Sequence, residues 1–95
     1  MTLPTADLFE SLVDQSIIVS TAQGTESWRV TNVQRHAAHA LRSDQPFTVT
    51  LLAPAGNDQQ QGMRAGVLPG GEAIDFFAVP VAATKDSVSY ELVFN

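Results

Sequence analysis

Short segments in which apolar and polar residues alternate are the feature of this sequence that most restricts its fold. Alternation with a period of two places every second side chain on one face of a β-strand. The segments follow one another after residue 15, and turn residues separate them. This pattern predicts an all-β fold, a small antiparallel barrel or sandwich of about six strands. The chain of 95 residues is long enough for one core and is expected to form a single domain over residues 1–95.

One short N-terminal helix is predicted to precede the strands, over residues 6–14. Thr5 can cap it, and apolar residues recur there at the i, i+4 spacing of a helix face. The period then changes to two, and residues 16–21 and 28–33 are rich in β-branched side chains. These two segments are predicted to form a hairpin.

The middle of the chain is predicted to be a loop over residues 34–45, or a helical turn, because alternation is absent there. A strand over residues 46–52 and a last strand over residues 88–94 are expected to be half-buried. The side chains predicted to point inward are Phe47, Val49 and Leu51 in the former and Val88, Tyr90, Leu92 and Phe94 in the latter.

A second hairpin is predicted around Gly70-Gly71, since glycine accepts the positive φ of a tight turn. A two-residue turn would pair Val67 with Ile74 and Ala65 with Phe76. Arg64 and Asp75 would then share the opposite face and could form a weak ion pair. Pro80 cannot donate to a strand ladder, so its position is predicted to be an edge or a bulge.

The charge of the chain restricts its partners. The net charge is −5, and the basic residues stand singly, which argues against nucleic acids and against anionic membranes. No secretory signal peptide or membrane-spanning segment is recognisable, so a cytoplasmic location is expected. The chain has no cysteine, which excludes disulfides and thiolate metal sites.

Residues that could bind a metal or catalyse a reaction are sparse. His36 and His39 are three residues apart and could share a metal with Asp44, yet a complete ligand set is missing. The nucleophile motif of serine hydrolases is absent, and the glycines of 66–71 lack the lysine of a phosphate-binding loop. Glu72 is predicted to be solvated beside its turn, as is Asp75. We therefore expect no catalytic residue, no metal and no cofactor, and the protein is predicted not to be an enzyme.

Two aromatic residues with polar atoms, Trp28 and Tyr90, lie on alternating segments. They are predicted to pack in the core or at the mouth of a barrel, where they could alternatively contact an apolar or sugar-like ligand. An internal volume of about 300 Å³ or more would support the ligand, and a filled core would support assembly with other proteins.

The neighbouring rings of Phe76 and Phe77 must point to opposite faces of one strand. One ring then needs a cover from the helix, from another sheet or from another chain. Charged residues make up 16% of the chain, against about 25% in a typical soluble domain. Because interfaces are depleted in charge, we predict a protein-interaction surface that includes Phe76, Phe77 and Val79. A monomer with a surface of uncharged polar residues would show the same composition.

The chain also resembles a family of short bacterial proteins that is described as a domain of unknown function. The resemblance implies no catalytic residues, and it implies an association with phage-tail-like or tail-collar-like proteins. The residues that carry it are Leu8-Phe9-Glu10, Leu12-Val13, Ile17-Ile18-Val19, Pro46-Phe47-Thr48-Val49, Gln61-Gly62, Phe76-Phe77-Ala78-Val79-Pro80-Val81 and Tyr90-Glu91-Leu92-Val93-Phe94-Asn95.

The function predicted from these observations is that of a non-enzymatic structural or protein-interaction module, which could self-associate or serve as an accessory of a phage-tail-like assembly. The alternative is a small barrel that binds an apolar or sugar-like ligand near Trp28 and Tyr90.

Overall fold

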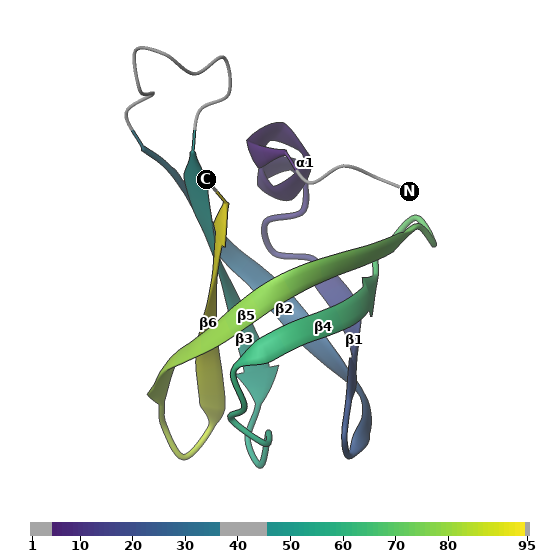
Figure 1. Ribbon diagram of the computed structural model, residues 1–95, viewed down its shortest axis with the longest axis vertical. Coiled ribbons are helices and arrows are strands. Elements are labelled where there is room, and N and C mark those ends of the chain that lie inside the picture. The colour runs from purple at the N-terminus through teal and green to yellow at the C-terminus, as the bar shows by residue number, and fades with distance from the viewer. Residues whose placement is uncertain (1–4, 37–45, 95) are drawn as a thin grey trace.

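The computed structural model describes residues 5–36 and 46–94. Six strands form a closed antiparallel barrel in the order β1-β2-β3-β6-β5-β4, with β1 paired to β4 (Figure 1). The all-β fold with a short N-terminal helix is thus confirmed, and the architecture is a barrel. The elements are α1 (Ala6–Ser11), β1 (Ser16–Thr21), β2 (Gly24–Arg35), β3 (Phe47–Pro54), β4 (Gly62–Val67), β5 (Ala73–Ala83) and β6 (Ser87–Phe94).

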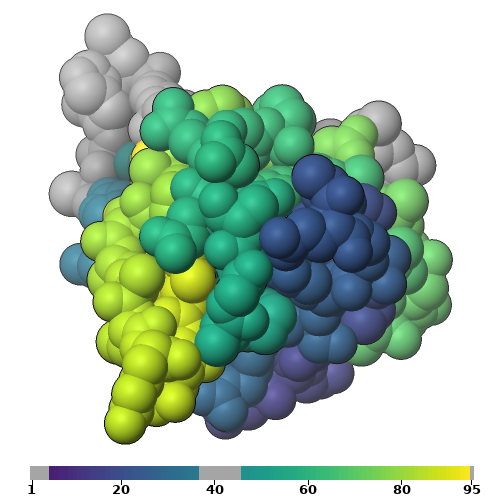
Figure 2. All heavy atoms as spheres, turned by 90° about the horizontal axis from the view of Figure 1, so that it is seen from below, coloured from purple at the N-terminus to yellow at the C-terminus, as the bar shows by residue number. Residues whose placement is uncertain are grey.

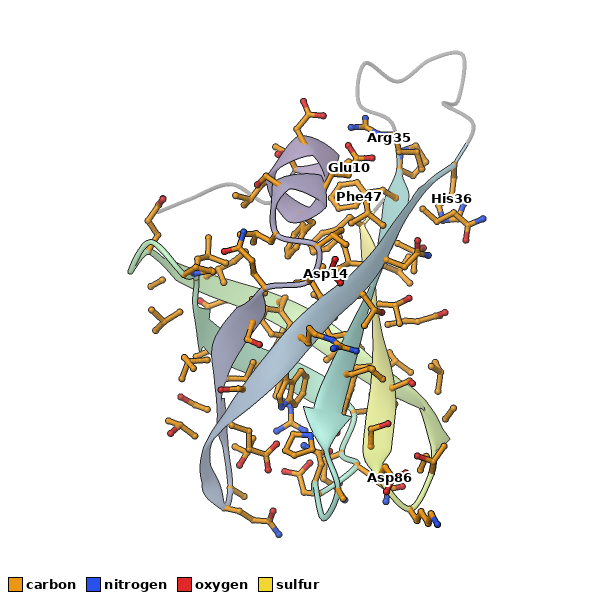
Figure 3. All side chains as sticks on the ribbon, turned by 180° about the vertical axis from the view of Figure 1, so that it is seen from behind. Glu10, Asp14, Arg35, His36, Phe47 and Asp86 are labelled. Atoms are coloured by element: carbon orange, nitrogen blue, oxygen red, sulfur yellow. The ribbon has the colours of Figure 1, made fainter. Side chains whose placement is uncertain are left out.

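Helix α1 covers one end of the barrel (Figure 1). Phe9 is fully buried, and its ring lies 6.2 Å from the ring of Phe47 and 5.6 Å from that of Phe94. On the outer side of the helix Glu10 accepts hydrogen bonds from the guanidinium of Arg35 at the end of β2 (Figure 3). This bonding lowers the pKa of the Glu10 carboxyl, although the pair is exposed to solvent. Apolar packing therefore fixes the helix on the barrel, and the ion pair only orients it.

The helix is shorter than the predicted 6–14. Thr5 caps its start as expected, since its Oγ1 accepts a hydrogen bond from the Leu8 amide at 3.1 Å. The chain then leaves the helix in a turn at Asp14, whose φ is +71°. The Asp14 amide donates to the carbonyl of Val30 in β2 at 2.8 Å, which ties the turn to the barrel. Tertiary pairing thus ends the helix before the apolar pattern does.

The hairpin of β1 and β2 is confirmed, with pairing from Ser16–Arg29 to Thr21–Gly24. The predicted loop over residues 34–45 is wrong at its start, because β2 continues to Arg35, which pairs with Phe47. The side chains of this extension are polar and exposed, so they show no alternation although the backbone is a strand. Residues 37–45 lie outside the described residues.

The hairpin of β4 and β5 is present, but its predicted register is wrong by one residue. The connection contains five residues, 68–72, instead of two, and Leu68 is buried within it. The Leu68 amide donates to the Glu72 carbonyl at 2.8 Å, and Gly71 adopts a φ of +93°. The observed pairs are Val67–Ala73, Gly66–Ile74, Ala65–Asp75 and Arg64–Phe76.

Because side chains alternate between the two faces of a strand, this one-residue shift exchanges the inward and outward side chains of β4 relative to the prediction. Ala65 and Val67 point outward, whereas Arg64 and Gly66 are buried. The predicted ion pair between Arg64 and Asp75 is therefore wrong: Arg64 is inside the barrel, and Asp75 is on its exposed face.

Gly66 shows why β4 has this orientation. A Cβ atom on Gly66 would lie 2.9 Å from Cγ2 of Ile17 and 3.1 Å from Cε1 of Phe76. Only glycine leaves room for these two core side chains. The inward position of β4 that faces Ile17 and Phe76 is therefore occupied by the glycine at 66 and not by residue 65 or 67.

Replacing Gly66 by alanine should lower the free energy of unfolding by about 2 kcal/mol, because a methyl group would overpack the core. Thermal and urea denaturation measure the change. Gly70 is the matched control, since a Cβ there would meet nothing within 4 Å and its φ is not in the left-handed range. Equal stability of Gly66→Ala and Gly70→Ala would contradict the register described here.

Large apolar side chains point into the barrel and form its core. The inward prediction for β3 and β6 is confirmed, except that Phe94 is only partly buried. Pro80 lies at a bulge, where the β5–β6 pairing shifts between Pro80 and Ala82. The largest fully buried side chains are Trp28, Tyr90, Phe9, Phe76, Ile17, Leu51, Leu92, Val19, Val30 and Val49.

The closure between β1 and β4 is short. It consists of the pairs Ile18–Val67 and Val19–Gly66. Figure 2 shows the end of the barrel opposite α1, where the segment after β3 lies between the β1–β2 hairpin and β5–β6. This segment, residues 55–61, closes the second end of the barrel.

Candidate functional site

A cluster of polar side chains lies at the end of the barrel that residues 55–61 cover. The Arg64 guanidinium from β4 forms an ion pair with Asp58, with Nη2 2.7 Å from Oδ1 and Nη1 3.3 Å from Oδ2. Nη2 also donates to the Gln60 carbonyl at 2.8 Å. The Asn57 side chain joins the cluster by donating to Glu26 Oε1 at 2.7 Å and by accepting from the Tyr90 hydroxyl. We call these residues, Glu26, Asn57, Asp58, Arg64 and Tyr90, the polar plug.

Two aromatic rings form the apolar side of the polar plug. Trp28 and Tyr90 are stacked with their centroids 4.3 Å apart, and both are fully buried. The Arg64 guanidinium carbon lies 5.3 Å from the Trp28 centroid and 5.7 Å from that of Tyr90, within the range of cation–π attraction. Trp28 Nε1 donates to Glu26 at 3.0 Å. Each polar atom of these rings therefore has a protein partner.

In the polar plug, Arg64 and Asp58 each favour the charged form of the other. Hydrogen bonding by Arg64 lowers the pKa of the Asp58 carboxyl, and the bond to Asp58 raises the pKa of Arg64. Burial raises the pKa of the Tyr90 phenol. At neutral pH the pair is ionised and the phenol is protonated, so Tyr90 can act as a hydrogen-bond donor to Asn57.

Acid should weaken the polar plug. Because the folded pKa of Asp58 lies below its unfolded value of about 3.9, its stabilisation is complete above that value. The stabilisation is then lost as the pH falls through the folded pKa. We expect the stability advantage of the wild type over Asp58→Asn to shrink between about pH 5 and pH 2, as measured by urea denaturation. An advantage that stays constant over this range would contradict the assignment.

This geometry makes the polar plug a structural closure. Within residues 5–36 and 46–94, no buried side-chain nitrogen or oxygen lacks a hydrogen-bond partner. Trp28 and Tyr90 are fully buried, so neither ring presents surface to solvent. Both predicted ligand contacts thus belong to the buried core of the barrel.

The predicted histidine cluster is described only in part. His36 follows β2 and is exposed, and its Nε2 lies 2.7 Å from the hydroxyl of Thr48 (Figure 3). His39 and Asp44 lie outside the described residues. Among the residues that the structure does describe, no three His, Asp or Glu side chains gather as metal ligands would.

The three interface candidates occupy three different environments. Phe76 is buried in the core, at 2% exposure, with its ring 6.3 Å from that of Trp28. Phe77 is 47% exposed on the outside of the barrel, and Val79 is half-buried beside it. The prediction that the two rings separate is confirmed. Phe76 cannot contact a partner without unfolding.

Phe77 belongs to a larger apolar surface on the outside of β1, β4 and β5. Phe77 pairs across the strands with Met63, which is 66% exposed, and Ile18 pairs with Val67. We call Ile18, Met63, Val67 and Phe77 the apolar face. β4 and β5 cross the front of the barrel in Figure 1, with β1 beside β4. On these three strands Asp75 is the one charged side chain that points outward.

Sequence reasoning missed most of both clusters. Ile18 and Met63 are exposed only because their strands lie in the observed registers. Arg64 could have been recognised as an inward residue from Gly66, two positions further on, since both side-chain positions share one face. Asn57 and Asp58 look like ordinary turn residues in the sequence.

The fold and its two clusters define a class: a small, closed, six-stranded β-barrel with an apolar core and with large apolar side chains exposed on its outer wall. Residues 4–94 match the family described as "Domain of unknown function (DUF6916)", and the chain belongs to this family. No curated protein and no solved structure matches the chain. In the described part of the chain, no helix has the length and apolar character needed to cross a membrane.

Proposed function

We propose that this protein is a non-enzymatic protein-interaction module that docks through the apolar face. The observation that carries the proposal is the grouping of four large exposed apolar side chains as two cross-strand pairs on neighbouring strands. Large exposed apolar side chains that gather on neighbouring strands commonly mark a protein contact. The titratable groups that meet in the barrel, Arg64, Asp58 and Tyr90, bond to one another and support a structural role.

The setting of this module is part of the proposal. Its resemblance to short bacterial proteins associated with phage-tail-like genes favours an accessory role in such an assembly.

The test compares three tagged chains expressed in the native cell: the wild type, Met63→Ser/Phe77→Ser, and the control Val93→Ser. Val93 is 54% exposed on β6 and lies outside the apolar face, so the control removes apolar surface elsewhere. Thermal melting first establishes that all three are folded. Quantitative mass spectrometry should then find at least one protein that accompanies the wild type and the control but not the double variant.

That protein should bind the purified wild type and control with the same affinity, and should bind the double variant at least about tenfold more weakly. The proposal fails if the three chains recover the same proteins in the same amounts.

A further inference from the structure

The position of Asp75 within the apolar face constrains the partner. In the β4–β5 register, the pair Ala65–Asp75 lies between the pairs Met63–Phe77 and Val67–Ala73. Asp75 and Phe77 are both exposed and are two residues apart on one strand, so they point to the same side. Any partner that covers both ends of the apolar face must also cover this carboxylate.

Among the residues that the structure describes, no Lys, Arg or His side chain forms an ion pair with the Asp75 carboxylate. Within residues 5–36 and 46–94, the ion pairs join Arg35 to Asp7 and Glu10, and Arg64 to Asp58. A carboxylate that is covered by apolar surface loses its hydration, and this loss opposes binding unless the partner supplies a hydrogen-bonded cation. The outward side chains of β1 and β4 are uncharged. The cation that pairs with Asp75 must therefore come from the partner.

A second copy of the chain fits this requirement poorly. A symmetric contact centred on Ala65 and Asp75 would bring two carboxylates together in an apolar environment. Each copy also carries a net charge of −5, which opposes their approach.

We propose, building on the function proposed above, that the partner is a different protein whose docking segment carries a lysine or arginine flanked by apolar side chains. The apolar side chains pack on the pairs Met63–Phe77 and Ile18–Val67. The basic side chain pairs with Asp75 between them. The apolar pairs then supply contact area, and the charge pair sets orientation and specificity.

The experiment selects peptides from a displayed random library on two targets, the wild type and Asp75→Lys. Peptides that also bind Met63→Ser/Phe77→Ser are removed from each selection. Because Asp75 is exposed, both targets should remain folded, which circular dichroism verifies. The wild type should enrich apolar peptides that contain Lys or Arg, and Asp75→Lys should enrich apolar peptides that contain Asp or Glu.

A selected basic peptide should bind Asp75→Asn about tenfold more weakly than the wild type, and the difference should decrease in high salt. Peptides that need Met63 and Phe77 but show the same charge preference on both targets would overturn the basic partner and leave the docking face intact. A selection that yields no peptide dependent on these two residues would count against the docking face itself.

Sedimentation of the wild type over a concentration series tests the second copy directly. A monomer at all concentrations is expected. A dimer that Phe77→Ser dissociates and Val93→Ser does not would overturn the proposal in favour of self-association.

Discussion

Replacing Phe76 by alanine should lower the free energy of unfolding by about 4 kcal/mol, whereas Phe77→Ala should lower it by less than about 1 kcal/mol. The two residues are neighbours of the same type, and only their environments differ. Phe76 is 2% exposed and packs near Trp28, so its removal leaves a cavity in the core of the barrel. Phe77 lies on the outer wall, where a smaller side chain leaves no cavity.

Chemical and thermal denaturation of the two variants measure this contrast. Since a change of 1 kcal/mol shifts the melting temperature of a domain of this size by about 4–8 °C, Phe76→Ala should melt roughly 15–30 °C below the wild type. Similar losses at both positions would show that the outer wall is covered, for example by a second chain.

The second large effect is expected at Arg64. The change Arg64→Met keeps most of the side-chain volume and removes the charge, which leaves the 14% exposed Asp58 carboxylate without its cation. Breaking a buried pair in this way costs about 3 kcal/mol or more, because the remaining charge stays desolvated. The variant also loses the cation–π contacts with Trp28 and Tyr90.

Arg35→Met is the matched control, since it removes the same group from an exposed ion pair with Glu10 and Asp7. It should change the stability by less than about 1 kcal/mol. Urea denaturation of the two variants under the same conditions compares them. Equal losses at Arg35 and Arg64 would contradict a structural role for the polar plug.

Most of the barrel could be predicted from the sequence, because alternation reports which strands have one face in a core. β3 and β6 were predictable for this reason, since one of their faces is consistently apolar. β4 was not, because its inner positions are Arg64 and Gly66 and its outer positions include Met63 and Val67. In that strand the usual relation between polarity and exposure is reversed.

The same reversal explains why the candidate sites were only partly foreseen. Neighbouring phenylalanines revealed that one ring must be outside, so Phe77 could be assigned to a surface. The other members of the apolar face depend on cross-strand register, and register depends on the five-residue connection 68–72. The polar plug depends on a loop that reaches across the barrel end, and local sequence carries no signal for such a contact.

The short closure between β1 and β4 bears on the order in which this protein folds. Two residue pairs, 18–67 and 19–66, join these strands, whereas β3 and β6 share eight pairs. Bringing distant segments together costs chain entropy, which the contacts formed between them must offset. Between β1 and β4 few backbone contacts are formed. We therefore expect the β1–β4 pairing to form last during folding and to open first during native-state fluctuations. Because Ile18 and Val67 sit on that closure, a partner bound to the apolar face would hold both strands and stabilise the closed barrel.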